Sequence, residues 1–231
     1  MTINILHLLE GAKKATGLTV IIDVFRAFST ACYAFEMGAK KIIPVALIDE
    51  AFRMKSSHHE YILMGERNEI KPEGFDFGNS PSLLHYQKVE GKTIVHTTSS
   101  GTQGIAAAVN ASEILTGSFV NAGAVIDYIR SRNPETVSLV CMGYACEYPT
   151  DEDTLCAEYM SNALNNIPND FMDITETIKQ GSGARFFDQS KQQWAPQEDF
   201  SLCLSLNKFN FVLKVENEGA GRYLRKIIPP Y

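Results

Sequence analysis

The chain has 231 residues, of which 45% are hydrophobic, so it is long enough to bury a substantial core. Its formal net charge of −6 at pH 7 argues against a general attraction to nucleic acid or to anionic membranes. A small anionic substrate would therefore need a local cluster of Arg, Lys and backbone N–H groups.

Eight strands are predicted from short runs of β-branched and other apolar residues. In chain order they are Ile3–Leu9, Leu18–Val24, Lys40–Ala46, Tyr61–Glu66, Lys92–Thr98, Glu113–Gly117, Thr136–Met142 and Asn210–Glu216. Several of these runs are continuously apolar rather than alternating, which is typical of strands that are covered on both faces.

Helices are predicted between these strands. They cover residues 28–39, 48–57, 102–112, 121–132 and 150–166, and a further helix is expected before the last strand. This alternation predicts one α/β domain over residues 1–231, layered around a largely parallel sheet. Residues 180–200 fit neither pattern and are expected to form an irregular flap.

The cysteines and the first residues indicate a cellular compartment. Five cysteines cannot all pair within one chain, and none forms a C-x-x-C motif, so we expect reduced thiols. The chain begins without a basic segment and apolar run of the secretory type, and no apolar stretch approaches the ~18 residues of a membrane helix. We therefore expect a cytoplasmic protein that binds neither membrane nor nucleic acid.

Polar residues follow four of the predicted strands, where α/β sheets bind ligands. The candidates are Asp23 and Arg26 after the second strand, Glu66, Arg67, Lys71, Asn79 and Ser80 after the fourth, Thr97, Thr98, Ser99, Ser100, Gly101 and Thr102 at the end of the fifth, and Glu152 and Asp153 after the seventh. We expect these turns to meet at one edge of the sheet.

Asp23 ends an apolar strand, where an unpaired carboxylate is costly to bury. It could cap the next helix with Arg26 as its ionic partner, or it could bind a divalent metal ion or act as a nucleophile. Phosphatases that form an aspartyl-phosphate often carry Asp-x-Asp, and here the third position is Phe25. Water is therefore the expected nucleophile.

The turn at residues 97–102 offers hydroxyl and backbone N–H groups between a strand and a helix. Such a turn either binds an anion or caps its own helix. Glu152 and Asp153 lie in the first turn of a predicted helix, where carboxylates commonly stabilise the helix dipole. They become candidate Mg²⁺ ligands if that turn faces Asp23.

Five strings carry a family resemblance. In chain order they are IIDVFRAFST, GERNEIKPEGFDFGNSP, HTTSSGT, TGSFVNAGAV and DEDTLCAE. Together they resemble the 2-phosphosulfolactate phosphatase family, the Mg²⁺-dependent phosphatases of coenzyme M biosynthesis. The resemblance implies a ComB-like α/β fold with a mixed, mostly parallel sheet between helices, and a homo-oligomer, namely a dimer. It also implies hydrolysis of a small anionic phosphorylated substrate, 2-phosphosulfolactate, to 3-sulfolactate and phosphate.

The resemblance also suggests a role for each candidate residue. Asp23, Arg26 and Arg67 would be catalytic, and Asp23 would bind Mg²⁺ with Glu152 or Asp153. The substrate would be bound by Glu66, Lys71, Asn79, Ser80, Thr97, Thr98, Ser99, Ser100, Gly101 and Thr102.

Asn68 and Glu69 stand where the family pattern has glycines, and the chain also departs from that pattern at Phe28, Ser100 and Glu158. The last three departures support an alternative, a non-catalytic binding or regulatory protein for an anionic metabolite. A third possibility is an oligomeric scaffold that binds no ligand. Phosphate release that depends on Mg²⁺ would separate the enzyme from both alternatives.

Overall fold

The computed structural model describes residues 1–219 and 221–229, and within them nine strands form one sheet. The strands are β1 (Thr2–His7), β2 (Gly17–Ile22), β3 (Lys41–Pro44), β4 (Ile62–Gly65), β5 (Thr93–Thr97), β6 (Ala111–Gly117), β7 (Thr136–Cys141), β8 (Val212–Glu218) and β9 (Gly221–Ile227). Their order across the sheet is β1-β7-β2-β6-β8-β9-β3-β5-β4.

The sheet contains two groups of parallel strands. One group is β1, β7, β2 and β6, and the other is β3, β5 and β4. The β8–β9 hairpin joins them through three antiparallel pairings, β6 with β8, β8 with β9, and β9 with β3. Because each antiparallel pairing reverses the strand direction, and there are three of them, the two groups run in opposite directions. The predicted α/β fold with a mixed, mostly parallel sheet is confirmed.

Nine α-helices lie within the described residues and cover the sheet. They are α1 (Leu8–Lys14), α2 (Ala27–Glu36), α3 (Ile48–Ser57), α4 (Pro81–Leu84), α5 (Gly101–Ala107), α6 (Ala122–Arg132), α7 (Asp151–Leu164), α8 (Phe171–Gln180) and α9 (Gln197–Cys203). None of them is both long enough and apolar enough to cross a lipid bilayer.

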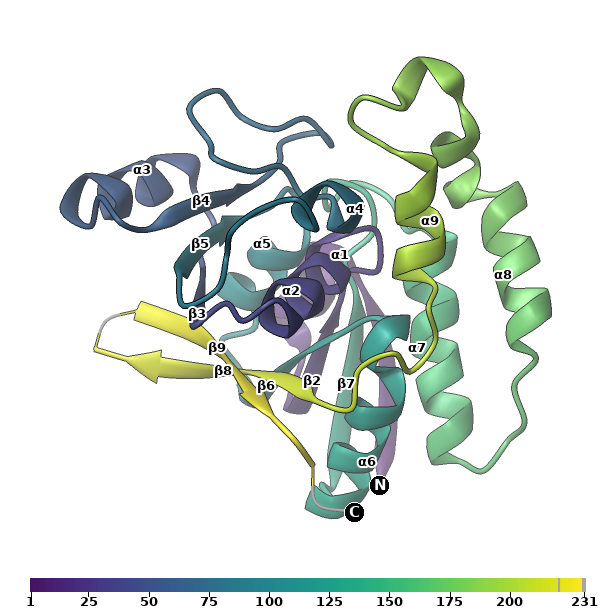
Figure 1. Cartoon of the computed structure of the whole chain (residues 1–231). Helices are drawn as coiled ribbons and strands as arrows, with labels where there is room; N and C mark the ends of the chain where they lie inside the picture. The colour runs from purple at the N-terminus through teal and green to yellow at the C-terminus, as the bar shows by residue number, and fades with distance from the viewer. Residues whose placement is uncertain (220, 230–231) are drawn as a thin grey trace.

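The largest apolar core surrounds α2. Ile21 of β2 and Ile42 of β3 belong to the same buried cluster as Phe28 and Phe35 of α2, although the two strands come from opposite strand groups. Figure 1 shows α2 near the centre of the molecule, with β3, β4 and β5 to one side of it. The sheet therefore curves around α2, and this curvature brings the two groups face to face.

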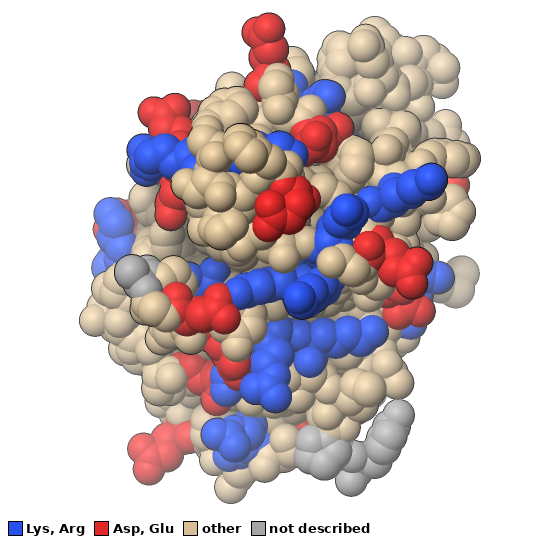
Figure 2. Space-filling view, turned by 60° about the vertical axis from the view of Figure 1, so that its left-hand side comes forward, with Lys and Arg blue, Asp and Glu red and all other residues tan. Residues whose placement is uncertain are grey.

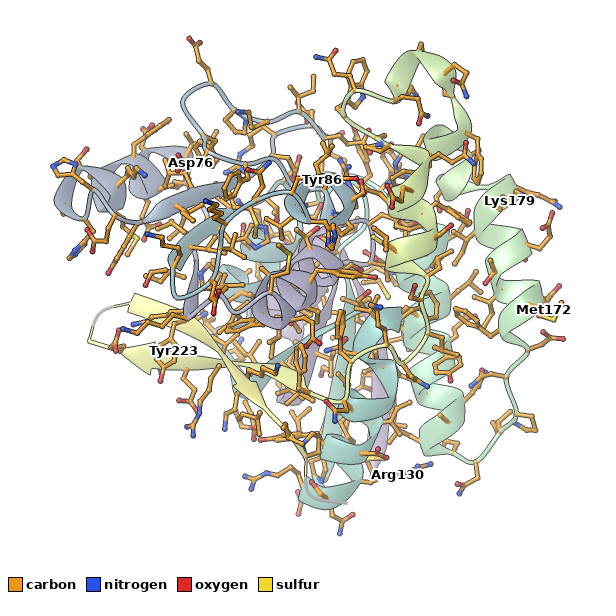
Figure 3. The ribbon with its side chains drawn as sticks, viewed as in Figure 1. Asp76, Tyr86, Arg130, Met172, Lys179 and Tyr223 are labelled. Atoms are coloured by element: carbon orange, nitrogen blue, oxygen red, sulfur yellow. The ribbon has the colours of Figure 1, made fainter. Side chains whose placement is uncertain are left out.

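A second core covers the other face of β1, β7, β2 and β6. Leu139 of β7 packs there with Ile126 of α6, Met160 of α7 and Ile178 of α8. Met172 is 84% exposed, and Figure 3 shows Met172 and Lys179 directed away from the body of the molecule. One face of α8 thus packs against the protein while the other faces solvent.

Several element boundaries differ from the prediction. The helix expected over residues 102–112 ends at Ala107, because Asn110 turns back to donate to the carbonyl oxygen of Lys13 and Ala111 begins β6. Residues 180–200 contain two 3-10 helices, η2 (Ser182–Phe187) and η3 (Gln189–Lys191), and the start of α9.

The surface carries both signs of charge close together. Figure 2 shows Lys and Arg in bands across one face, with Asp and Glu beside them. A groove lined by Lys40, Lys41 and Arg225 illustrates this mixture, since Lys41 is paired with Glu218 and Arg225 lies 3.2 Å from Glu216. Two of the cations in this groove therefore have a carboxylate partner.

Candidate active site

A small cleft lies where the segments after β2, β4, β5 and β7 meet. It is lined by Asp23, Phe25, Arg26, Glu66, Asn68, Glu69, Asn79, Ser99, Ser100, Gly143, Tyr144 and Ala145. Six of these were selected from the sequence, namely Asp23, Arg26, Glu66, Asn79, Ser99 and Ser100. Turns that are far apart in the chain thus meet, because the curved sheet brings the carboxyl ends of both strand groups together.

Asp23 is 6% exposed and is held by two backbone donors. Its Oδ1 accepts a hydrogen bond of 3.1 Å from the N–H of Ala27, and its Oδ2 accepts one of 2.8 Å from the N–H of Gly101. Burial, together with the nearby carboxylates of Glu66 and Glu152, raises the pKa of Asp23 to about 7, although the two N–H donors act in the opposite direction. The cleft therefore contains a carboxyl group whose negative charge is poorly compensated.

Glu66 joins the loop after β4 to the loop after β5. Its Oε1 accepts from the N–H of Ser99 at 2.7 Å, and its Oε2 accepts from the N–H of Glu69 at 2.8 Å and from Oγ of Ser99 at 3.0 Å. Both carboxylate oxygens are therefore used to fix the walls of the cleft.

Arg26 is locked in a buried ion pair. Its Nη1 lies 2.7 Å from Oδ2 of Asp199, and the two side chains are 3% and 0% exposed. The other oxygen of Asp199 accepts from Oγ of Ser80 at 2.9 Å and from the N–H of Ser82 at 3.0 Å. Ser80, a predicted substrate-binding residue, thus helps to anchor Arg26 through Asp199 and does not line the cleft.

Arg67 and Lys71 also lie outside the cleft lining. The guanidinium of Arg67 donates to the carbonyl oxygens of Glu66 and Ala46 and to Oγ1 of Thr97, at 2.7 to 2.8 Å. Burial lowers the pKa of Arg67. Lys71 donates to the carbonyl oxygen of Phe75 at 2.9 Å. In this geometry Arg67 supports the loop after β4.

The residues of the turn at 97–102 have two different roles. Thr98 and Thr102 bond to each other, since the N–H of Thr102 donates to Oγ1 of Thr98 and the N–H of Thr98 donates to Oγ1 of Thr102. These two residues cap the turn. Ser99 and Ser100 instead line the cleft, and Oγ of Ser100 donates to the carbonyl oxygen of Gly143 at 2.7 Å.

Glu152 and Asp153 lie behind the cleft. Asp153 accepts from the N–H of Val24 at 2.8 Å and from the N–H of Gly143 at 2.9 Å, so it ties the end of β2 to the loop after β7. Burial raises the pKa of both acids, and for Asp153 the charges of Glu152 and Asp23 act in the same direction. Within residues 1–219 and 221–229, no three His, Cys, Asp or Glu side chains converge closely enough to enclose a metal ion by themselves.

His96 is a buried residue that the sequence did not single out. Its Nε2 lies 3.1 Å from Oδ1 of Asn79, which lines the cleft. Burial, with a contribution from the charge of Arg67, lowers the pKa of His96 to about 3, so the ring is neutral at pH 7. Because a carboxamide oxygen only accepts, the ring donates from Nε2 and orients the Asn79 amide.

The departures from the family pattern at Phe28, Ser100 and Glu158 lie in different surroundings. Phe28 is 1% exposed in the core around α2, and Ser100 holds the loop after β7 through its bond to Gly143. Glu158 is exposed on α7. Phe28 thus packs in the core, while Ser100 contributes a hydroxyl group to the cleft wall.

Comparison with known proteins supports the resemblance. A family model described as 2-phosphosulpholactate phosphatase matches residues 4–218. A relative from Bacillus subtilis (strain 168) is 31% identical over 216 residues, which are 91% of this chain and 92% of that protein. Relatives from Caldicellulosiruptor saccharolyticus and Thermotoga petrophila are 42% and 45% identical, over 67% and 64% of this chain.

The aligned regions span about two thirds of those last two relatives, 65% and 63% of their own lengths. All three relatives are named probable 2-phosphosulfolactate phosphatase. The resemblance seen in the sequence is therefore confirmed, together with the predicted enzyme class, the phosphoric monoester hydrolases. With a family match that extends over most of its length, the chain belongs to the 2-phosphosulpholactate phosphatase family.

Proposed function

We propose that the chain catalyses the Mg²⁺-dependent hydrolysis of 2-phosphosulfolactate to 3-sulfolactate and phosphate. The family match and the names of the relatives support the substrate. The observation that carries the proposal is the cleft itself, which is lined by the buried residues Asp23 and Arg26 together with Ser99 and Ser100.

The donor set of the cleft fits a magnesium ion. Mg²⁺ is often bound by one or two protein carboxylates, and water and substrate phosphate oxygens complete its six ligands. Asp23 and Glu66 both line the cleft and supply hard oxygen ligands. Burial and the neighbouring carboxylates disfavour the ionised form of Asp23 and raise its pKa, and a divalent cation would favour that form. Asp23 would bind the ion, with Glu66 or Glu152 as the second carboxylate.

The protein would bind the phosphoryl group mainly through neutral and cationic donors. Arg26, held rigid by Asp199, would face the phosphoryl oxygens, and Asn79 and the Ser99–Ser100 turn would add uncharged donors. Bound Mg²⁺ would polarise the phosphoryl group and neutralise developing charge. Preorganised donors act most strongly on charge that develops in the transition state, so Arg26 is expected to contribute to kcat.

Phosphate release from 2-phosphosulfolactate tests the proposal. The purified chain should release phosphate with Mg²⁺ present, and EDTA should abolish release. Asp23→Asn should lower kcat by about 10³-fold or more, whereas Asp127→Asn, at an exposed position on α6, should leave it unchanged. Binding of the ester without any release, with or without metal ions, would instead indicate the non-catalytic alternative.

The remaining expectations from the sequence and from the resemblance stay predictions. They are the homodimer, the cytoplasmic location and the role in coenzyme M biosynthesis. Sedimentation equilibrium of the purified chain measures the first directly, because one chain has a mass of 25.6 kDa and a dimer twice that mass.

A further inference from the structure

Arg185 is a cation beside the cleft that the sequence did not indicate. It belongs to η2, and its side chain is 14% exposed. Its Nε lies 2.7 Å from Oε1 of Glu69, which lines the cleft, and its Nη2 lies 3.8 Å from Oε1 of Glu152. One guanidinium thus faces carboxylates from two different loops.

Aromatic rings hold this guanidinium in place. Its central carbon lies 5.4 Å from the ring centroid of Phe25, which also lines the cleft, and 5.0 Å from that of Phe186. Aromatic faces attract a guanidinium without using its N–H groups. Nη1 of Arg185 also donates to the carbonyl oxygen of Ser182 at 2.5 Å, which fixes the side chain further. Nε and Nη2, which face Glu69 and Glu152, remain suited to bidentate recognition of an anion.

The carboxylate that pairs with Arg185 is easier to displace by another anion than the carboxylate that pairs with Arg26. The partner of Arg26 is Asp199, which is fully buried and holds two serines as well. The partner of Arg185 is Glu69, which is 18% exposed and has a φ of 68° in the turn after β4. Displaced Glu69 can move into water, whereas displaced Asp199 would leave a buried charge unpaired.

The charge balance of the cleft indicates what would displace Glu69. Asp23, Glu66 and Glu69 line the cleft, and the charge of Arg26 is already matched by Asp199. A phosphate ester that carries further acidic groups needs another cation. We infer that Arg185 determines substrate specificity by exchanging Glu69 for the carboxylate or sulfonate of the substrate. The inference rests on the proposed function and specifies how that same site recognises its substrate.

Three esters test this role. They are 2-phosphosulfolactate, 2-phospholactate, which lacks the sulfonate, and isopropyl phosphate, which lacks the sulfonate and the carboxylate. In Arg185→Gln, the KM for 2-phosphosulfolactate relative to that for isopropyl phosphate should rise about ten-fold or more. The KM for 2-phospholactate relative to that for isopropyl phosphate then identifies the acidic group. If this second ratio also rises, Arg185 binds the carboxylate, and if it is unchanged, Arg185 binds the sulfonate. Arg53→Gln, on the exposed surface of α3, is the matched control and should leave the ratio unchanged.

Two further variants keep the inference testable if Arg185→Gln does not fold. Arg185→Lys should raise the same KM ratio by a smaller factor, because lysine keeps the charge and loses the bidentate geometry. Glu69→Gln removes the competing carboxylate and should lower the KM for 2-phosphosulfolactate about three-fold. An unchanged ratio in the folded Arg185 variants, or an equal rise of KM for all three esters, would overturn the inference.

A binding measurement separates this inference from the proposed function. Calorimetric titration with 3-sulfolactate, which carries both acidic groups and no phosphate, should give a Kd about ten-fold weaker in Arg185→Gln than in the wild type. Phosphate release together with an unchanged Kd would refute the role of Arg185 alone. Absence of release from every ester together with the expected change in Kd would refute only the phosphatase.

Discussion

The carboxylate of Asp23 and the backbone N–H of Gly101 are joined by a hydrogen bond of 2.8 Å across 78 positions of sequence. Asp23 follows β2 and Gly101 begins α5 after β5, so this bond connects the two strand groups at the cleft. The absence of a side chain at Gly101 permits the approach. A Cβ there would lie 2.9 Å from Oδ2 of Asp23, 2.9 Å from Cζ of Phe28 and 3.0 Å from Cβ of Ala27.

Gly101→Ala is therefore expected to lower the free energy of unfolding by about 1–3 kcal/mol, because the packed side chains of Asp23, Phe28 and Ala27 have to shift. It should also lower kcat, since Asp23 is among them. Urea denaturation and phosphate release measure the two effects. The control is Gly221→Ala, whose added Cβ meets only the carbonyl oxygen of Glu218 at 3.7 Å. Equal stability of the two variants would contradict the close approach at Gly101.

Asp199→Asn should lower the free energy of unfolding by about 3–5 kcal/mol, because the guanidinium of Arg26 would remain buried without a counter-charge. Activity should fall as well, since Asp199 fixes the position of Arg26. Urea denaturation measures the loss of stability. Glu10→Gln, which removes the exposed pair of Glu10 with Lys13, should leave the urea midpoint unchanged. A loss below 1 kcal/mol in Asp199→Asn would show that Arg26 finds another partner.

The lowered pKa of His96 predicts that part of the folding stability is lost on acidification. Its pKa is about 3 in the folded chain, below the 6.5 expected when unfolded, so between these values the unfolded chain binds the extra proton. The stabilisation is present above pH 6.5 and is lost as pH falls through this window, by about 1.4 kcal/mol per pH unit. Relative to the wild type, His96→Gln should show a shallower loss of stability on acidification.

Chemical denaturation from pH 7 down to pH 4.5 measures this difference. Buried acids such as Asp23 have raised pKa values and act in the opposite direction, but they are common to both proteins and cancel in the comparison. His59→Gln, at an exposed position, serves as the control. Parallel stability curves for wild type and His96→Gln would show that folding does not lower the pKa of His96.

Arg67→Met distinguishes support from substrate contact. The guanidinium satisfies two carbonyl oxygens and the hydroxyl group of Thr97, so its removal should lower the free energy of unfolding by about 1–3 kcal/mol. Arg53→Met, on the surface of α3, should cost less than 0.5 kcal/mol, a roughly neutral change. If Arg67→Met loses activity without losing stability, Arg67 contacts the substrate, as the sequence predicted.

The sequence predicted the strands and several cleft residues for the same physical reason. Continuous apolar runs such as residues 18–24 fit strands covered on both faces, and the observed β2 spans Gly17–Ile22. A carboxylate directly after such a run, as in Asp23 or Glu66, is costly to bury unless it is hydrogen-bonded or paired with a cation. Both residues line the cleft.

Other features had no local signal. Asp199 looks like an ordinary acidic residue of a first helical turn, and its partner Arg26 is 173 positions away. The loop after β7 turns through positive φ at Ala145 and Cys146, where the sequence offers no glycine. The helix α1 was missed because its run follows β1 without a break, and the chain turns at Leu8, with φ of 60°.

The β8–β9 hairpin has a consequence for the order of assembly. It is the only link between the two parallel groups in the described sheet, and its strands are the last of the nine along the chain. During synthesis each group can form its own ladder early, whereas the continuous hydrogen-bonded sheet requires β8 and β9, which are made after both groups. The two groups can therefore pack around α2 before the sheet that joins them is complete.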